Sequence, residues 1–345
     1  MRAAVLRGGR MIVRDDVDDP APGFGQVLVN VKACGICGSD LHFATHGSSM
    51  VELIDQMRGT PDLGVPRVDL DRDVFMGHEF AAEVLEVGPG TEGPAAGTLV
   101  TSVPVMVSAA GVADLAYSNE LPSGYSERML LAAPLVLPVP NGLDAKRAAL
   151  TEPMAVGLHA VNRSGVVTGE GAVVIGCGPV GIAVIAALRL RGIEPIVACD
   201  FSPMRRSLAT TMGAHHVIDA QQEDVFDAWA THGGGRQLVV FEAVGVPGVI
   251  NGVFRSAPGK TRLVVVGVCM GGDQVTPFWA ITKEISVQFA FAYDLDEFAG
   301  SLRSIAEGEV DVEPMITGEV DLDGVAGAFE DLGRPDRHCK ILVTA

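Results

Sequence analysis

The feature that most constrains the fold is a glycine-rich turn in the middle of the chain. Gly176-Cys177-Gly178-Pro179-Val180-Gly181 fits the pattern G-x-G-x-x-G and lies between an apolar strand predicted at 172–175 and a helix predicted at 180–190. The first glycine allows the tight turn, the second lets the backbone approach a pyrophosphate, and the third lets helix and strand pack closely. The helix N-terminus, with its unpaired N–H groups, then faces the phosphates. The turn predicts a dinucleotide site.

A carboxylate follows at the position that such a site needs. Asp200 ends the next predicted strand, where it would accept hydrogen bonds from a ribose diol and repel a 2′-phosphate. NAD is therefore expected rather than NADP. Arg205 and Arg206 leave NADP open, because a nearby arginine can accommodate that phosphate. The alternative for the whole motif is an ordinary strand-to-helix turn with a helix-capping aspartate.

Strands and helices alternate from residue 171 onward. Strands are predicted at 172–176, 195–199, 216–218, 238–241, 262–267 and 285–291, and helices at 180–190, 203–212, 224–231 and 249–256. This alternation predicts a doubly wound parallel sheet covered on both faces. The chain is then expected to form two amphipathic helices, at 294–307 and 322–332, and a closing strand at 338–343.

The part before about residue 145 has the pattern of an irregular, mostly β unit. Strands are predicted at 1–5, 11–13, 26–33, 80–87, 99–107 and 127–133. A helix is expected from about Met50 to Met57, ended by 58–61 and followed by a polar loop to Asp73. A further helix at 145–159 is expected to be interrupted at Glu152-Pro153. With 345 residues, the chain is expected to form two domains of an α/β protein.

Charge and cysteine content exclude several classes of protein. The formal net charge of −18 argues against nucleic acid or an anionic membrane as partner. Six cysteines and an N-terminus without an apolar signal segment favour a reducing cytoplasm without disulfides. The apolar run 172–188 approaches the length of a membrane span, but its glycines favour a strand, turn and helix.

A second cluster of reactive side chains lies at 34–42, directly after a predicted strand. We hypothesise that Cys37, His78 and Glu152 bind one zinc ion, with Glu79 close by. A catalytic zinc takes three protein ligands, commonly from thiolate, imidazole and carboxylate groups, and leaves one position for substrate. Bound there, the ion would lower the pKa of an alcohol and stabilise its alkoxide.

Three further side chains of the 34–42 segment have expected roles around this ion. Asp40 is a candidate to accept a hydrogen bond from the second ring nitrogen of His78. The Ser39 hydroxyl is placed to receive the alcohol proton, and His42 is placed to pass it to solvent.

Other interpretations of these residues stay open. Cys34 and Cys37 could form half of a structural zinc site or a redox pair, although no second C-x-x-C completes four sulfurs. A redox motif should open a helix, whereas this one follows a strand. Glu152 could cap a helix. His46 and His159 are expected to be structural.

These motifs together resemble a known family. The chain resembles the zinc-dependent medium-chain alcohol dehydrogenases, most of all the sorbitol and threonine dehydrogenase branch. The motifs that carry this resemblance are the segment from Cys37 to His42, Gly77-His78-Glu79, Glu152-Pro153, the glycine turn and Asp200. The resemblance implies a GroES-like catalytic domain at 1–148, completed by 290–345, and a Rossmann domain at 149–289.

The resemblance also implies roles for single residues. Arg205 corresponds to a basic residue near the adenosine ribose, and Val244 and Val268 to residues on the nicotinamide side. In this branch the third protein contact of the zinc can be indirect or shared with the glutamate after the histidine, so Glu79 and Glu152 both remain candidates. Ser39 and His42 would form the proton relay.

The sequence departs from the family in two places. Residues 97–127 contain no cysteine, so no structural zinc is expected, and the number of subunits, dimer or tetramer, stays open. His78 follows Cys37 at a longer distance than usual, so the extra segment 48–73 is expected to border the cleft.

The expected activity is NAD- and zinc-dependent interconversion of a secondary alcohol, diol or polyol and its ketone. There are two alternatives. The protein could act on an amino alcohol or an aldehyde, or it could bind a dinucleotide without turnover.

Overall fold

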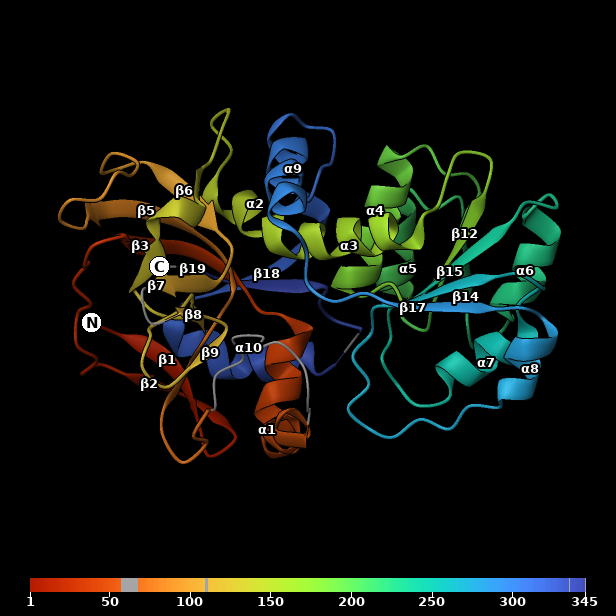
Figure 1. Ribbon diagram of the computed structural model, residues 1–345, viewed down its shortest axis with the longest axis horizontal. Helices are drawn as coiled ribbons and strands as arrows, with labels where there is room; N and C mark the ends of the chain where they lie inside the picture. The colour runs from red at the N-terminus through yellow and green to blue at the C-terminus, as the bar shows by residue number, and fades with distance from the viewer. Residues whose placement is uncertain (57–67, 109–110, 335, 345) are drawn as a thin grey trace.

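The computed structural model describes residues 1–56, 68–108, 111–334 and 336–344. The chain forms two lobes that lie side by side, with helices α3 (Thr151–Ser164) and α9 (Leu295–Ala306) at their junction (Figure 1). The first lobe is mostly β and the second is a parallel sheet with helices. The predicted α/β class is confirmed.

The first lobe is organised around the long strand β3 (Gln26–Gly35). Its valines Val27, Val29 and Val31 alternate into the core, as its sequence predicts. The larger sheet has the order β11-β6-β5-β3-β19-β18, and β10 also pairs with β3. The bounds are β5 (Glu79–Val87), β6 (Leu99–Ser102), β10 (Arg128–Ala132), β11 (Val136–Pro138), β18 (Ile316–Val320) and β19 (Lys340–Thr344).

The remaining strands of this lobe form smaller sheets. The order β2-β1-β4-β9 makes a four-stranded sheet, and β7 and β8 form a hairpin. Their bounds are β1 (Ala3–Arg7), β2 (Arg10–Arg14), β4 (Val74–Met76), β7 (Val105–Ser108), β8 (Gly111–Asp114) and β9 (Tyr117–Ser118). The single strand expected at 99–107 is therefore two strands, β6 and β7, and β4, β8 and β9 were not predicted.

The second lobe has a six-stranded parallel sheet in the order β14-β13-β12-β15-β16-β17. Its bounds are β12 (Gly171–Ile175), β13 (Ile196–Asp200), β14 (His216–Asp219), β15 (Leu238–Glu242), β16 (Arg262–Val265) and β17 (Ser286–Phe289). The helices are α4 (Pro179–Leu190), α5 (Pro203–Met212), α6 (Val225–His232), α7 (Val249–Ser256) and α8 (Pro277–Thr282). Each predicted strand and helix of this lobe is present within a few residues; α8 was not predicted.

The apolar run 172–188 forms β12 and the first part of α4, as expected. Among the described residues, no helix is both long enough and apolar enough to cross a membrane.

Two predictions about helices are wrong. The helix expected to begin near Met50 is α1 (Gly38–Gln56), which starts twelve residues earlier and is kinked at His46. The break expected at Glu152-Pro153 lies instead at Leu150, between α2 (Ala145–Ala149) and α3. Proline is tolerated in the first turn of a helix, where its missing N–H has no partner to lose.

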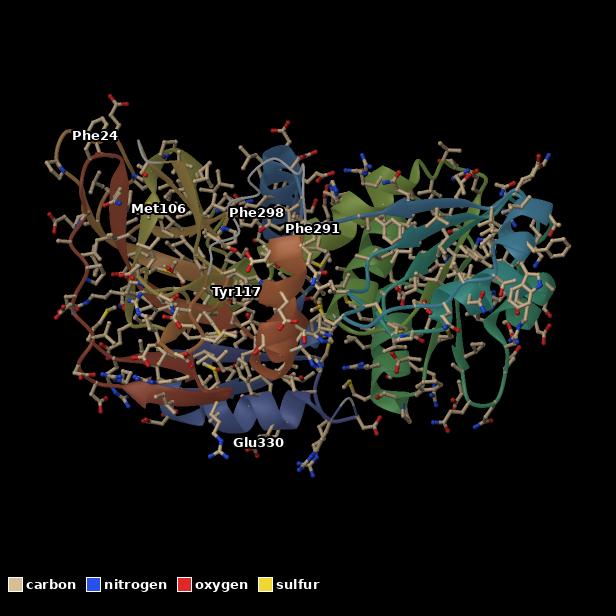
Figure 2. All side chains as sticks on the ribbon, turned by 60° about the horizontal axis from the view of Figure 1, so that its bottom comes forward. Phe24, Met106, Tyr117, Phe291, Phe298 and Glu330 are labelled. Carbon is tan, nitrogen blue, oxygen red and sulfur yellow. The ribbon has the colours of Figure 1, made fainter. Side chains whose placement is uncertain are left out.

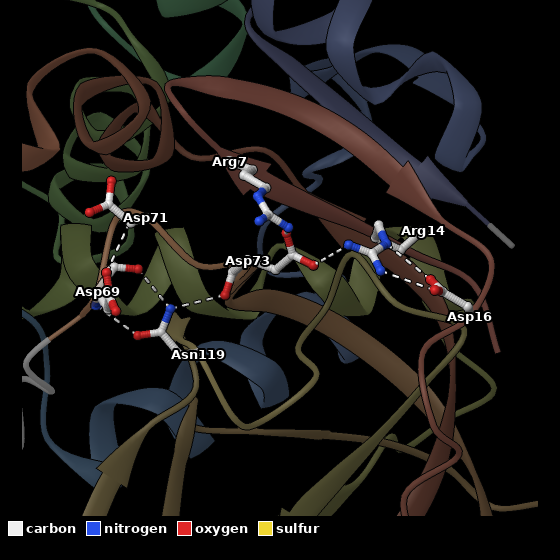
Figure 3. Close-up of polar contacts among 7 residues, drawn as sticks. All are labelled: Arg7, Arg14, Asp16, Asp69, Asp71, Asp73 and Asn119. Atoms are coloured by element: carbon white, nitrogen blue, oxygen red, sulfur yellow. Dashed lines mark hydrogen bonds and ion pairs between the residues drawn. The ribbon is translucent and has the colours of Figure 1, made fainter.

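The long segment before β4 is fixed at its C-terminal end. Asn119 hydrogen-bonds the backbone of Asp69 and Asp73, and Asp73 is ion-paired with Arg7 and Arg14 (Figure 3). The part of the predicted loop at 57–67 lies outside the described residues.

Candidate functional site

Three of the predicted metal ligands lie together. Cys37, His78 and Glu79 each offer a ligand atom within 4.8 Å of the other two. Cys37 follows β3, and His78 and Glu79 lie at the junction of β4 and β5. Because β3 and β5 are paired neighbours, the sheet register brings these distant parts of the chain to one point.

Cys37 lies at the N-terminus of α1. Its N–H donates to Oδ2 of Asp40 at 3.0 Å, and the Asp40 N–H donates back to the Cys37 carbonyl at 3.1 Å. The partial positive charge of a helix N-terminus stabilises a thiolate. The expectation that this motif does not open a helix is therefore wrong, because α1 begins at the next residue, Gly38.

Asp40 is fully buried and faces His78. Its Oδ1 lies 3.5 Å from Nδ1 of His78, and its Oδ2 accepts a hydrogen bond of 2.6 Å from the Tyr125 hydroxyl. Burial acts to lower the pKa of His78, but the charges of Asp40 and Cys37 outweigh it and raise that pKa well above its usual value. The site therefore attracts positive charge.

Glu79 is neutralised in part by a lysine that the sequence analysis missed. Lys340 Nζ lies 2.6 Å from Oε1 of Glu79, with both side chains fully buried, and also donates to the Ile36 carbonyl at 3.0 Å. A Cβ at Gly35 would lie 2.0 Å from Oε2 of Glu79, so only glycine fits there. A lone lysine within the apolar strand 339–343 was the signal, since a buried lysine needs a partner.

Unpartnered polar atoms point to a ligand at this place. Oε2 of Glu79 is buried and has no hydrogen-bond partner among the described residues, and Nδ1 of His78 and Oδ1 of Asp40 face each other at 3.5 Å without forming a hydrogen bond. Leaving such atoms unpaired costs free energy. A thiol, an imidazole and a carboxylate in this arrangement fit a zinc ion with one open position.

Glu152 is close to this group but is not part of it. It lies buried in the first turn of α3, and burial is the main cause that raises its pKa to about 7, against the opposing charges of His78 and Lys340. Its carboxyl lies beside Tyr293, and the Glu152 charge helps to raise the pKa of that phenol well above its usual value, after burial. The structure therefore favours Glu79 over Glu152 as the carboxylate nearest to Cys37 and His78.

Ser39 and His42 lie on the first turns of α1, next to the metal group. Both are partly buried. Partial burial and then His46 lower the pKa of His42. Tyr117, which the sequence analysis missed, lies beside Ser39 with its ring edge-on to His78.

The glycine turn follows β12 at the point where the sheet order reverses. Gly176 has φ +91°, and a Cβ on Gly181 would lie 1.9 Å from the Gly176 carbonyl oxygen. Gly178 precedes α4, which Pro179 and Val180 begin, and a Cβ there would meet nothing closer than 3.9 Å. In doubly wound sheets, ligands bind at this reversal.

Asp200 lies at the end of β13 beside the turn. Its two carboxylate oxygens accept hydrogen bonds of 2.8 Å from the N–H groups of Cys177 and Ser202. Arg206 is already bound to the Asp200 and Phe201 carbonyls and to Asp219.

Arg205 differs from its neighbour. Its buried Nε finds no partner in the part of the chain that the structure describes, and Nη1 is the atom nearest to Gly178. Arg205 is therefore the arginine left available to a ligand at the turn.

Val244 and Val268 lie in the loops after β15 and β16, and both are about half exposed. A Cβ on Gly176 would lie 2.7 Å from Val244, and one on Gly245 would lie 2.6 Å from the Val268 carbonyl oxygen. Three loops therefore meet at the carboxyl edge of the parallel sheet.

Helix α3 connects the two groups of residues. Glu152 in its first turn lies near the metal group, and Gly157 packs against Ala183 of α4, where a Cβ would lie 2.5 Å away. The same α4 carries the glycine turn at its N-terminus. This arrangement defines a class of protein, the two-lobed oxidoreductase with a metal group in one lobe and a dinucleotide turn in the other.

Comparisons with known proteins identify the family. The family model for the alcohol dehydrogenase GroES-like domain matches residues 23–141, and that for the zinc-binding dehydrogenase matches 179–307. A (R,R)-butanediol dehydrogenase of Bacillus subtilis is 32% identical over 99% of each chain. The crystal structure of 2R,3R-butanediol dehydrogenase from Bacillus subtilis covers 100% of this chain and 99% of that one, with a TM-score of 0.83 and 30% identity.

A putative zinc-binding dehydrogenase from Sinorhizobium meliloti, solved bound to NADP, has a TM-score of 0.82 at 26% identity and covers 100% of this chain and 99% of that one. The chain belongs to the zinc-dependent medium-chain alcohol dehydrogenase family, and it is an oxidoreductase that uses zinc and a nicotinamide coenzyme. The resemblance found in the sequence is confirmed, including the GroES-like unit.

Proposed function

We propose that the protein oxidises a secondary alcohol, most specifically a vicinal diol or polyol, to the ketone with NAD, and catalyses the reverse reaction. The observation that carries this proposal is the group of Cys37, His78 and Glu79. The similarity of the whole chain to a butanediol dehydrogenase supports the choice of substrate class.

Cys37 and His78, with Glu79, would hold one zinc ion in each chain. Zinc held by these residues would supply Lewis-acid polarisation of the alcohol oxygen, and a nicotinamide coenzyme would supply the acceptor for the hydride. Asp40 orients the His78 ring and Lys340 limits the negative charge of Glu79, so both keep the ligand atoms in place. Glu152 serves as a second carboxylate near the group.

Two side chains of α1 would carry the alcohol proton to solvent. Ser39 would accept it at its hydroxyl oxygen while releasing its own hydroxyl proton towards His42, and His42 would take up that proton and pass it to solvent. Partial burial and then His46 lower the pKa of His42, which favours the neutral ring that can accept a proton.

NAD is the coenzyme that the dinucleotide turn favours. Asp200 would put a negative charge near the 2′-phosphate of a bound NADP, and Arg206 is committed to other partners. Arg205 keeps one donor free, which makes coenzyme preference a point for measurement.

The domain boundaries follow the sheets. We propose a catalytic domain of residues 1–148 and 290–345 and a coenzyme domain of residues 149–289. Strands β18 and β19 belong to the sheet of β3, which supports the return of the chain to the first domain.

We propose further that two copies associate through β17, at the edge of the parallel sheet. Val287 and Phe289 on β17, with Phe278 and Ile281 on the adjacent α8, are exposed, Phe289 by 66% and Ile281 by 72%. An exposed apolar edge strand is a site for pairing with another strand. A second copy of the chain offers the same edge, as a twofold contact requires.

The proposal is tested by metal analysis together with an activity screen. We expect about one zinc per chain in the purified protein. Alcohols, diols and polyols, supplied with NAD or NADP, should give reduced coenzyme, and diols with NAD should be among the best pairs. In Cys37→Ala, zinc and turnover should be lost while NADH still binds, as measured by its fluorescence. The matched control Cys269→Ser should keep its zinc.

Two results would contradict the proposal. Full zinc content and full turnover in Cys37→Ala would remove the metal group from the reaction. Coenzyme binding without turnover of any alcohol, amino alcohol or aldehyde would instead favour a dinucleotide-binding protein that is not an enzyme.

A further inference from the structure

The Tyr117 hydroxyl is buried next to the metal group, yet no residue that the structure describes gives it a hydrogen bond of good geometry. β9 pairs with β4 so that Tyr117 lies opposite Met76, two residues before His78. The Tyr117 ring stacks on Phe43 of α1 with centroids 4.3 Å apart, and it meets the His78 ring edge-on at 6.3 Å. The ring is thus held from two sides beside a metal ligand.

The backbone that carries Tyr117 is fixed independently of any ligand. The hydroxyl of the next residue, Ser118, accepts two backbone hydrogen bonds. Asn119 then makes three hydrogen bonds with the backbone of Asp69 and Asp73 (Figure 3). The hydroxyl position is therefore set in advance, as a specific binding group requires.

An unpaired hydroxyl at this position is unfavourable. Leaving a buried donor without a partner costs free energy, and buried tyrosines usually find a partner. Ser39 lies close enough to influence Tyr117, but the contact lacks hydrogen-bond geometry. A polar atom of a ligand at the metal group would remove this cost.

We propose that Tyr117 binds the second hydroxyl of a vicinal diol and thereby makes the site selective for diols over simple secondary alcohols. The inference rests on the proposed function, because it needs the reacting carbon beside Cys37 and His78. A site that hydrogen-bonds a substrate hydroxyl rejects the analogue lacking it, since its own buried group is then left unpaired.

The test compares a matched pair of substrates. With zinc-bound Tyr117→Phe and NAD, kcat/KM for (2R,3R)-2,3-butanediol should fall at least about tenfold, mainly through KM, while that for 2-butanol stays within about twofold. Binding without turnover gives a second readout. In the presence of NADH, 3-hydroxy-2-butanone should bind the variant more weakly than the wild type, whereas 2-butanone should bind both equally.

The control deletes another phenol hydroxyl. Tyr293→Phe removes a phenol hydroxyl that lies beside Glu152, so the ratio of diol to mono-alcohol kcat/KM should not change. The wild type itself should prefer the diol by at least about tenfold.

A wild type without that preference, or a Tyr117→Phe enzyme that keeps the preference, overturns the inference and leaves the proposed function intact. A wild type that oxidises no alcohol contradicts the proposed function. In that case the binding of 3-hydroxy-2-butanone still decides the role of Tyr117.

Discussion

Asp200 fixes the backbone of the dinucleotide turn through both of its carboxylate oxygens. Both of its oxygens accept a backbone N–H, one from Cys177 inside the turn and one from Ser202 at the start of α5. A carboxylate has about four acceptor sites, so capacity remains for a ribose diol. A change at Asp200 therefore alters both the shape and the charge of the turn.

Replacing Asp200 by alanine should weaken the binding of both coenzymes, and the binding of NAD more than that of NADP. The loss of the two backbone hydrogen bonds should affect both coenzymes, whereas the loss of the negative charge should help only NADP, which carries the 2′-phosphate. We expect the ratio of kcat/KM for NAD over that for NADP to fall about tenfold, which corresponds to about 1.4 kcal/mol.

The control for this change is Asp227→Ala, which removes an exposed carboxylate from α6 of the same lobe. It should leave the ratio unchanged. An unaltered ratio in Asp200→Ala would contradict the role given to this carboxylate.

At the scale of elements, the buried Lys340–Glu79 pair ties β19 to β5. Removing one partner leaves an uncompensated charge in the core, which costs about 3 kcal/mol or more. Lys340→Met should therefore lower the free energy of unfolding of the zinc-free protein by about 3 kcal/mol, measured by urea denaturation. Adding Glu79→Gln should restore part of the loss, because the unpaired charge is removed.

The comparison for Lys340→Met is the exposed pair of Lys146 and Glu319. Lys146→Met should leave the free energy of unfolding nearly unchanged, since exposed pairs contribute little. If Lys340→Met and Lys146→Met lowered the free energy of unfolding equally, the claim that burial makes the Lys340–Glu79 pair important would be contradicted.

Helices α3 and α9 are joined by a second polar group. Oε2 of Glu297 lies 2.7 Å from Nδ1 of His159, and Oε1 accepts a hydrogen bond from Asn162. Burial raises the pKa of Glu297, but the N–H of Asp294, Asn162 and His159 together lower it below 4.5. These side chains satisfy one another, as expected for a structural His159.

This lowered pKa predicts an acid dependence of stability. The contribution of Glu297 is present above the ordinary glutamate pKa of 4.5 and is lost as pH falls through its lower folded value. Glu297→Gln should thus be less stable than the wild type by about 1 kcal/mol at pH 6, and the difference should shrink below pH 4.5.

Thermal unfolding between pH 3.5 and 7 measures this difference. Exposed Glu307→Gln, at the end of the same helix, serves as control and should follow the wild type throughout. A gap between Glu297→Gln and the wild type that is constant with pH would contradict the prediction.

Elements with a regular pattern could be predicted from the sequence, and elements fixed by tertiary contacts could not. The strands of the parallel sheet are continuous apolar runs, so their positions were clear. The start of α1 was missed because glycines and polar residues conceal a helix whose first turn is stabilised by Asp40. Short β4 and β9 exist only through pairing with each other and with β1.

The same distinction holds for the residues of the candidate site. Cys37, His78 and the glycine turn each lie in a recognisable local motif, so they could be singled out from the sequence. Lys340 and Tyr117 have no motif, because their importance comes from what the fold places beside them. The ranking of Glu79 before Glu152 also needed the structure, since it depends on which carboxylate the sheet register brings to Cys37.

At the scale of the whole molecule, the exposed edge of the parallel sheet predicts association. Phe289→Lys puts a charge on β17 and should convert an oligomer into monomers, as measured by light scattering after gel filtration. Phe24→Lys is the control, because Phe24 is 82% exposed in the other lobe and should not affect the oligomer (Figure 2). A wild type that is already monomeric, or a Phe289→Lys protein that stays associated, would contradict the proposed interface.

The order in which the sheets are completed affects how the chain folds during translation. All six strands of the parallel sheet leave the ribosome before β19, which lies between β3 and β18 and carries the lysine that neutralises Glu79. Until then, Ala33 to Gly35 of β3 lack their partner strand and the Glu79 carboxylate lacks its lysine. The coenzyme-binding sheet can form first, and the charge of Glu79 is balanced by Lys340 only when the final strand is inserted.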